Sequence, residues 1–339
     1  MHAYKCRYPE ESKTVRFKLE DSISRYFQEY SPANIFPDHP AVRWSVPELL
    51  WEKINNSCPP ETLNRCLETL LRRPEVHLRV NTLKTRLPDL LREMRDVPVS
   101  KGKISPVALR LSKHTNLTRH PLFRRGMFEF QDESSQLVAY ACDPQSNDLV
   151  VDLCAGGGGK TLHLAALMQN KGTLIATDRD PGRLRDLKPR AKRAGASNIR
   201  VTSLRDLRHF RDRADILLID APCSGSGVYR RNPDAKWELT NEMLDLRIST
   251  QKRLLDEYAG LLKQRGRLIY ASCSLLPDEN AMQIDGFLRR HPGFAPAPLR
   301  DAFAKHAVDI PASPAAHMLT ILPQDYDSDG FFIATLRRK

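Results

Sequence analysis

Short apolar runs alternate with helical patterns over residues 146–339 of this 339-residue chain. Parallel strands need long crossover connections, usually a helix, and these crossovers are almost always right-handed. The alternation therefore predicts an α/β fold with a doubly wound, mostly parallel sheet. The expected strands are 149–153, 172–178, 198–202, 214–220 and 267–272, and the expected helices are 160–169, 181–195, 241–264 and 278–290.

The remainder of the chain divides into two further parts and a closing hairpin. Residues 1–75 read as a helical segment, with apolar residues at helical spacing over 15–30 and 60–73. Residues 76–145 read as a small α/β unit, because short strand patterns in it surround a helical one. Two strand patterns joined by an Asp-rich turn over 317–339 predict a C-terminal antiparallel hairpin on the sheet.

The charge of the chain points to an anionic partner. The net charge is +12 and the isoelectric point about 9.5. The positive charge is clustered, because residues 101–128 carry seven Lys or Arg and no acid, and residues 183–213 carry eleven against three acids. A polyphosphate such as RNA or DNA fits this pattern best. The alternative is that these stretches form ordinary solvated charged faces.

The cysteines and the polar N-terminus indicate the cellular compartment in which the protein is expected. Seven cysteines, an odd number with no CxxC pair, predict neither a disulfide framework nor a zinc ribbon. The first residues lack the apolar core of a signal peptide, and no apolar run approaches the roughly 20 residues that cross a membrane. We therefore expect a cytoplasmic protein with reduced thiols, no metal and no membrane partner.

A glycine-rich loop, "DLCAGGGGKT", follows one predicted strand and opens a helix. A Walker A loop would need glycine where Cys154 stands, and a dinucleotide fingerprint would need spaced glycines. The third candidate ligand is S-adenosylmethionine, which needs a glycine-rich turn and an acid for its ribose. Asp178 ends the next strand, where a ribose-binding acid belongs. Its alternative role is to cap a helix that starts at Pro181.

Two cysteines follow buried strands and point to covalent chemistry. Cys223 comes after "ADILLIDAP" and Cys273 after "GRLIYAS". If the two strands are parallel neighbours, both thiols and Asp220 meet at one edge of the sheet, beside the ligand of the glycine-rich loop. A nucleophilic thiol at such a site fits covalent catalysis on a bound substrate. The remaining cysteines are expected to act as small buried hydrophobic residues, namely Cys6, Cys58, Cys66, Cys142 and Cys154.

These motifs together resemble the Nop/Sun family of RNA (cytosine-5) methyltransferases. The resemblance rests on "DLCAGGGGKT", "ATDRD", "LLIDAPCSGSGVYRRNPDAKW" and "IYASCSLLPDEN", supported by "LRVNTL" and "GMFEFQDESSQLVA", and covers about residues 76–339. It implies a Rossmann-like methyltransferase sheet, a small RRM-like unit before it, and S-adenosylmethionine as methyl donor. Of the resembling motifs, the pair that carries cysteines is specific, whereas the glycine loop alone is not.

The resemblance also implies roles for individual residues. Cys273 would add to carbon 6 of cytosine, Cys223 would assist product release, and Asp220 would contact the base at nitrogen 3. Asp178 would hold the donor's ribose. The donor pocket would be lined by Cys154, Ala155, Gly156, Gly157, Gly158, Gly159 and Lys160, with Lys160 also near the reacting base, and by Asp206 and Asp220.

The chain departs from the family pattern at three places. Gly156 and Gly157 replace an Ala-Pro pair that is frequent in the family loop, and Ser272 replaces the threonine before the nucleophile. The family's "GD" after the third strand is written here as "SLRDL", which makes Asp206 the candidate acid on the adenine side.

Several functions stay open at this point. The leading one is methylation of ribosomal RNA, by a monomer whose RNA contacts come from the small unit and residues 101–128. The alternatives are methylation of transfer RNA, methylation of DNA cytosine with Cys223 as nucleophile in a Pro-Cys motif, and a non-catalytic RNA-binding assembly factor.

Overall fold

The computed structural model describes residues 40–55, 57–112, 115–310, 313 and 315–339. The helix expected over 15–30 lies outside these residues. The chain divides into two compact units, Met1–Trp51 and Glu52–Lys339. The first holds α3 (Pro40–Arg43) and the start of α4 (Glu48–Ile54), and the second holds all later elements.

A small four-stranded unit follows α5 (Pro60–Leu71). Its elements are β1 (Val76–Val80), α6 (Leu87–Glu93), β2 (Val99–Lys101), β3 (Ala108–Leu111), α7 (Pro121–Arg124) and β4 (Phe128–Phe130). The strands pair antiparallel in the order β2-β3-β1-β4, which is the ferredoxin-like arrangement. Leu78, Leu90, Leu109 and Phe128 form its solvent-free core. The small α/β unit expected from the sequence is therefore confirmed.

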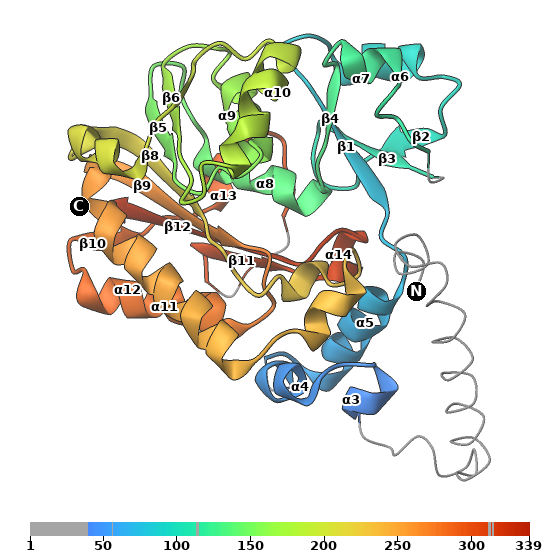
Figure 1. Cartoon of the computed structure of the whole chain (residues 1–339), viewed down its shortest axis with the longest axis vertical. Coiled ribbons are helices and arrows are strands. Elements are labelled where there is room, and N and C mark those ends of the chain that lie inside the picture. Colours follow the sequence, from blue (N-terminus) through green and yellow to red (C-terminus); the bar gives the residue numbers. More distant parts are fainter. Residues whose placement is uncertain (1–39, 56, 113–114, 311–312, 314) are drawn as a thin grey trace, which may run out of the picture. The chain divides into compact units, whose positions relative to one another are not determined.

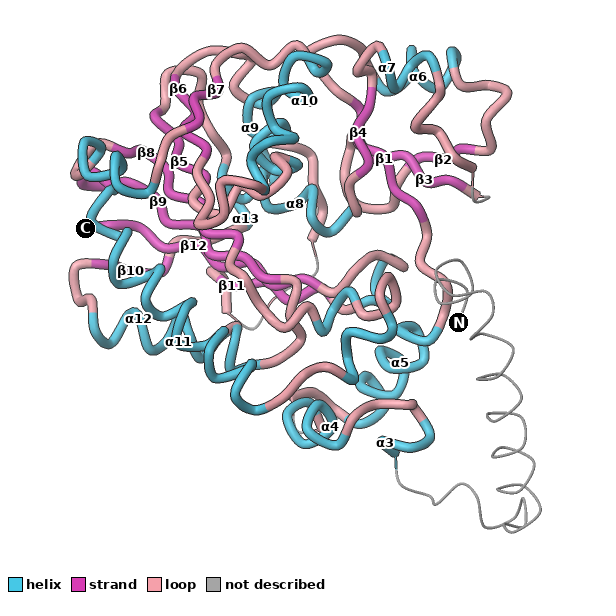
Figure 2. Tube along the Cα trace, in the orientation of Figure 1, coloured by secondary structure: helices cyan, strands magenta, loops and turns pink. Residues whose placement is uncertain are grey.

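The large sheet has the order β10-β12-β9-β8-β5-β6-β7, with β11 paired to β12 (Figure 2). The neighbouring pairs from β9 through β7 are parallel, whereas β12 runs antiparallel to its partners. The strands are β5 (Leu149–Asp152), β6 (Thr173–Ala176), β7 (Ile199–Val201), β8 (Ala214–Asp220), β9 (Leu262–Ser272), β10 (Phe294–Pro296), β11 (Met318–Ile321) and β12 (Phe331–Arg338). The doubly wound, mostly parallel sheet and its C-terminal antiparallel hairpin are both confirmed.

Alternate residues of the central strands face two separate cores. In β8, Ile216 and Leu218 point into one core, and Leu217 and Ile219 point into the other. Because successive strand side chains point to opposite faces, helices must cover both sides of the sheet. The first core is covered by α8 (Glu133–Cys142), α9 (Gly159–Leu167) and α13 (Arg300–Lys305), and the second by α11 (Asn241–Tyr258) and α12 (Ala281–Arg290) (Figure 1).

The helix expected over 181–195 is shorter than predicted. Residues Arg183–Asp186 form a 3₁₀ turn, and α10 spans only Leu187–Ala194. Pro189 explains the late start, because proline lacks an N–H and is tolerated only in the first turn of a helix. Gly195, at φ +74°, ends the helix in the left-handed conformation.

The boundary expected between the helix 241–264 and the strand 267–272 is wrong. The helix ends at Tyr258, and β9 already begins at Leu262. The polar run after Leu262 continues the helical pattern in sequence but lies in a strand that shifts register against β8. Arg265, at φ +62°, stands at this irregularity. Strand β10 and helices α13 and α14 (Pro323–Tyr326) were not expected from the sequence.

Candidate active site

The two cysteines singled out in the sequence lie side by side. Strands β8 and β9 are parallel neighbours, with Asp220 opposite Ala271, so the residues after each strand emerge at the same edge. The Sγ atoms of Cys223 and Cys273 are 3.4 Å apart, and both side chains are partly exposed. The site is therefore a pair of free thiols that a substrate can reach.

Cys223 is the protonated member of the pair. The hydrogen bond with Cys273, and then burial, raise the pKa of the Cys223 thiol well above its ordinary value. Cys223 therefore stays protonated at neutral pH and can donate its S–H to the sulfur of Cys273. An S–H donor at this position lies within reach of the sulfur that the sequence predicts to be the nucleophile.

Glu279 holds the loop that carries Cys223. This fully buried carboxylate accepts the backbone N–H of Ser224 at 2.8 Å and the hydroxyl of Ser224 at 2.5 Å. Gln251, from α11, donates its Nε2 to the same carboxylate at 3.0 Å. Glu279 lies only six residues after Cys273, so it ties the two cysteine loops together. Sequence reasoning missed this residue, although it stands in the quoted "LLPDEN".

A serine cluster completes the contact between the two loops. The hydroxyl of Ser274 lies 3.2 Å from that of Ser224 and 3.1 Å from that of Ser226, which in turn accepts the N–H of Leu275 at 2.8 Å. The buried side chains of Ser226 and Ser274 are thus satisfied by each other and by the backbone. The spacing of the two thiols is set by these contacts between segments about 50 residues apart.

An ion pair lies next to the thiols. Lys160, in the first turn of α9, donates from Nζ to Oδ2 of Asp220 at 2.7 Å, and its side chain is 13% exposed. Burial alone would lower the pKa of Lys160, but the charge and hydrogen bond of Asp220 outweigh it and raise that pKa. Lys160 therefore stays charged and orients the carboxylate of Asp220 at the end of β8.

The glycine-rich loop connects β5 to α9 beside this ion pair. Its Gly156 donates its backbone N–H to Oδ2 of Asp178 at 3.0 Å, and Asp180 donates its own to Oδ1 at 2.9 Å. Asp178 is 7% exposed, so its carboxylate is fixed at the end of β6. The structure thus brings this acid to the loop, as the sequence spacing indicated.

Three carboxylates, those of Asp152, Asp178 and Asp220, surround the loop. Burial, followed by the charge of Asp220, raises the pKa of Asp152 to about 7, against a lowering hydrogen bond from Thr161. Its Oδ1 is buried with no hydrogen-bond partner among the described residues. Crowded acids of this kind favour a cationic ligand.

The last donor-side candidate is Asp206. It lies on a 3₁₀ turn, Leu204–Phe210, that follows β7, and it is exposed. Its Oδ2 accepts the hydroxyl of Ser203 at 2.7 Å.

Gly158 is required by the conformation of the loop, and its replacement by alanine is expected to destabilise the fold by about 2 kcal/mol. Its φ is +83°, and a Cβ would lie 2.3 Å from Cδ1 of Leu187, which is itself only 1% exposed. Urea unfolding of Gly158→Ala measures this loss. The matched control is Gly293→Ala, because nothing lies within 4 Å of a Cβ there. Equal unfolding free energies for the two variants would contradict this account of the loop.

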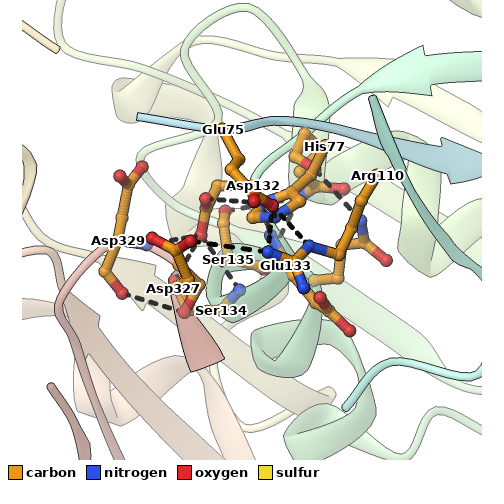
Figure 3. A network of polar contacts seen from close by, with 12 residues as sticks. Glu75, His77, Arg110, Asp132, Glu133, Ser134, Ser135, Asp327 and Asp329 are labelled. Atoms are coloured by element: carbon orange, nitrogen blue, oxygen red, sulfur yellow. Dashed lines mark hydrogen bonds and ion pairs between the residues drawn. The ribbon is translucent and has the colours of Figure 1, made fainter. Parts of the chain in front are cut away.

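A polar network joins the small unit to α8 and to the segment that precedes β12 (Figure 3). Asp132, the N-cap of α8, contacts Nδ1 of His77 on β1 at 2.9 Å. Arg231 donates to Asp132 at 2.8 Å and to Asp329 at 2.6 Å. Burial would raise the pKa of Asp132, but His77 and Arg231 lower it well below its usual value. The negative charge of Asp132 therefore links three segments at the side of the site.

The comparison with known proteins decides the family. Residues 139–337 match the family described as 16S rRNA methyltransferase RsmB/F, and residues 46–118 match the ferredoxin-like domain of RsmF/B-like methyltransferases. The chain belongs to the RsmB/F family. This membership agrees with the Nop/Sun resemblance of the sequence motifs.

Individual relatives of this RsmB/F chain support the same conclusion. It is 34% identical over 308 residues to a probable ribosomal RNA small subunit methyltransferase B of Bacillus subtilis, covering 88% of this chain and 68% of that relative. The chain thus spans about two thirds of its relative's length. A methyltransferase homologue from Pyrococcus horikoshii is 27% identical, with a TM-score of 0.75, covering 88% of this chain and 97% of that one. The solved protein PH0851 is 30% identical, with a TM-score of 0.82, covering 91% and 70%.

The cofactor of this RsmB/F methyltransferase is S-adenosylmethionine, and the residues of the loop fit it. The donor carries a positive sulfonium and an ammonium group, which suit a loop bordered by the acids Asp152, Asp178 and Asp220. Gly156 leaves room for a ligand beside the loop, because a Cβ there would meet only the guanidinium of Arg183, at 4.0 Å.

Among the described residues, no group of three or more His, Cys, Asp or Glu could hold a metal ion, and no helix could span a membrane.

Proposed function

We propose that this RsmB/F chain transfers a methyl group to carbon 5 of a cytosine in RNA, with small-subunit ribosomal RNA as the leading substrate. The observation that carries the proposal is the pair of thiols 3.4 Å apart beside the ion pair of Lys160 and Asp220. Methylation at an exocyclic nitrogen or a ribose oxygen needs no thiol, whereas carbon 5 of cytosine is a poor nucleophile that covalent catalysis activates.

In the proposed reaction, the sulfur of Cys273 adds to carbon 6 of the cytosine, and the electrons of the 5,6 double bond move to carbon 5. Asp220, held by Lys160, carries a proton when the base is bound and donates it to nitrogen 3, which stabilises the electron-rich adduct. S-adenosylmethionine, when bound, supplies the methyl group to carbon 5. Water then takes the carbon-5 proton, the electrons of that C–H bond expel the sulfur of Cys273, and the S–H of Cys223 protonates the leaving sulfur.

The remaining candidate residues position the donor. Asp178 lies at the end of β6, where its carboxylate can accept the two ribose hydroxyl groups. The loop Cys154–Gly159 presents backbone groups to the amino-acid portion of the donor, and Asp206 is the proposed acid on the adenine side. The target base must leave its stack to reach the thiols, which costs a few kcal/mol and is offset by contacts to the RNA backbone.

The substrate test is incubation of the protein and S-adenosylmethionine with small-subunit ribosomal RNA, followed by bisulfite sequencing. We expect one cytosine of that RNA to become resistant to conversion. Transfer RNA and DNA of cytosine-containing sequence serve as parallel substrates. Methylation of transfer RNA alone would reassign the substrate, and methylation at any atom other than carbon 5 would overturn the proposed chemistry.

A further inference from the structure

Two basic stretches that lie far apart in the sequence meet in one groove of the folded chain. Arg124 and Arg125 belong to the acid-free stretch 101–128, whereas Lys192 and Arg193 belong to the basic stretch 183–213. They line an open groove of about 660 Å³ together with Lys84, Met127 and Pro189. Five of its seven lining residues are cationic and none is acidic.

The two walls of the groove are fastened to each other. Lys84 donates from Nζ to the backbone oxygens of Arg125 at 2.7 Å and Arg193 at 2.6 Å. Asn81, buried below, donates from Nδ2 to the oxygens of Gly126 at 2.8 Å and Ala194 at 2.7 Å. One wall belongs to the small unit and the other to α10, so the groove is preformed where the two meet. A preformed site loses little conformational entropy when a ligand binds.

Two of the charges have structural partners. Arg193 pairs with the buried Glu129 and lies over the ring of Phe123, 4.0 Å from its centroid. Arg125 contacts Glu93 at 3.3 Å on the surface. These pairs explain why the walls are stable, and they leave part of the positive charge of the groove uncompensated.

Arg124 and Lys192 are the charges of the groove with no such structural partner, whereas Lys84 is held by backbone oxygens alone. Both are exposed, and within the described part of the chain no carboxylate pairs with either. Gathering like charges in a concave site costs repulsion, which a polyanionic ligand removes. A merely solvated charged face would be expected to spread such residues apart.

We propose that this groove binds the phosphate backbone of the RNA substrate, at a site separate from the catalytic thiols. The inference rests on the proposed function for the identity of the polyanion. Guanidinium groups suit phosphate oxygens because they donate two parallel hydrogen bonds, and the ammonium of Lys192 adds a point charge. Met127 and Pro189 add apolar surface to the lining, against which ribose can pack.

The groove is placed so that an RNA chain bound in it can continue to the active site. Arg190, on the same helix α10, donates to the carbonyl of Gly157 in the glycine-rich loop and to Glu129 at 2.9 Å. One wall of the groove is therefore attached to the loop that binds the methyl donor. RNA held here fixes the register of the molecule without contacting the target base, as phosphate contacts generally do.

The test compares Arg124→Ala/Lys192→Ala with wild type for binding of a labelled RNA hairpin, measured by fluorescence anisotropy at several salt concentrations. The matched control is Lys252→Ala/Arg289→Ala, which removes one lysine and one arginine from α11 and α12. We expect the groove variant to raise Kd by about tenfold and to reduce the slope of log K against log salt by about 1.5. The control should stay within about twofold of wild type, and urea unfolding should be unchanged for both.

Methylation kinetics provide a second readout. We expect the groove variant to raise the KM for RNA while kcat at saturating RNA stays unchanged, because neither residue touches the reacting atoms. A groove variant with wild-type Kd and salt slope would overturn this inference and leave the proposed function standing. A wild-type protein that neither binds nor methylates RNA would instead overturn the proposed function.

Discussion

Replacing Cys273 with alanine is expected to reduce methyl transfer to RNA by at least about 1,000-fold, as for loss of other catalytic nucleophiles. Without its sulfur no bond forms to carbon 6, and carbon 5 stays too electron-poor to accept the methyl group. Transfer of labelled methyl from S-adenosylmethionine to RNA measures the effect. Cys58→Ala is the control, because this thiol lies two residues before α5, far along the chain from both cysteine loops.

The outcome at Cys273 also decides between the cytosine mechanisms. Full activity of Cys273→Ala, with activity lost in Cys223→Ala, would place the nucleophile in the Pro-Cys segment, as the DNA-type alternative requires. Calorimetry measures the binding of S-adenosylmethionine to Cys273→Ala. Unchanged binding shows that the variant has lost the chemical step and has kept the donor pocket.

Replacing Cys223 with alanine is expected to trap the enzyme on its RNA. Cys273 can still add to carbon 6 and the methyl group can still be transferred, but the thiol 3.4 Å away that assists release is gone. We expect kcat to fall by about 100-fold or more. A covalent protein–RNA complex should accumulate, visible as a band of reduced mobility after denaturing electrophoresis.

The control for this trap is the double variant Cys223→Ala/Cys273→Ala, which should form no covalent complex. Turnover of Cys223→Ala at the wild-type rate, without any covalent species, would show that Cys223 takes no part in release. A covalent complex in the double variant would show that another residue attacks the base.

Elements whose sequence patterns are local could be predicted correctly from the sequence alone. The strand 214–220 coincides with β8, because the apolar run "ILLI" is bounded by charged residues and must be buried on both faces. The juxtaposition of Cys223 and Cys273 followed from parallel pairing of two such strands, which the register of β8 against β9 bears out. Topology alone placed both thiols at one edge.

The features that sequence reasoning missed depend on contacts between distant segments. Glu279 looks like any acid in a polar loop, and only the folded chain shows Ser224 and Gln251 donating to it. The early start of β9 is set by pairing with β8 and not by the helical pattern of its first residues. The basic groove likewise exists only because the small unit packs beside α10.

The central claim, that the sulfur of Cys273 attacks the base, is tested most directly with RNA that contains 5-fluorocytosine at the target position. Fluorine cannot leave carbon 5 as a proton does, so the covalent complex of the wild-type protein should persist once the methyl group has been transferred. Digestion and mass spectrometry then identify the peptide that carries the nucleotide. We predict the peptide that contains Cys273, and a nucleotide attached to the Cys223 peptide would contradict the mechanism.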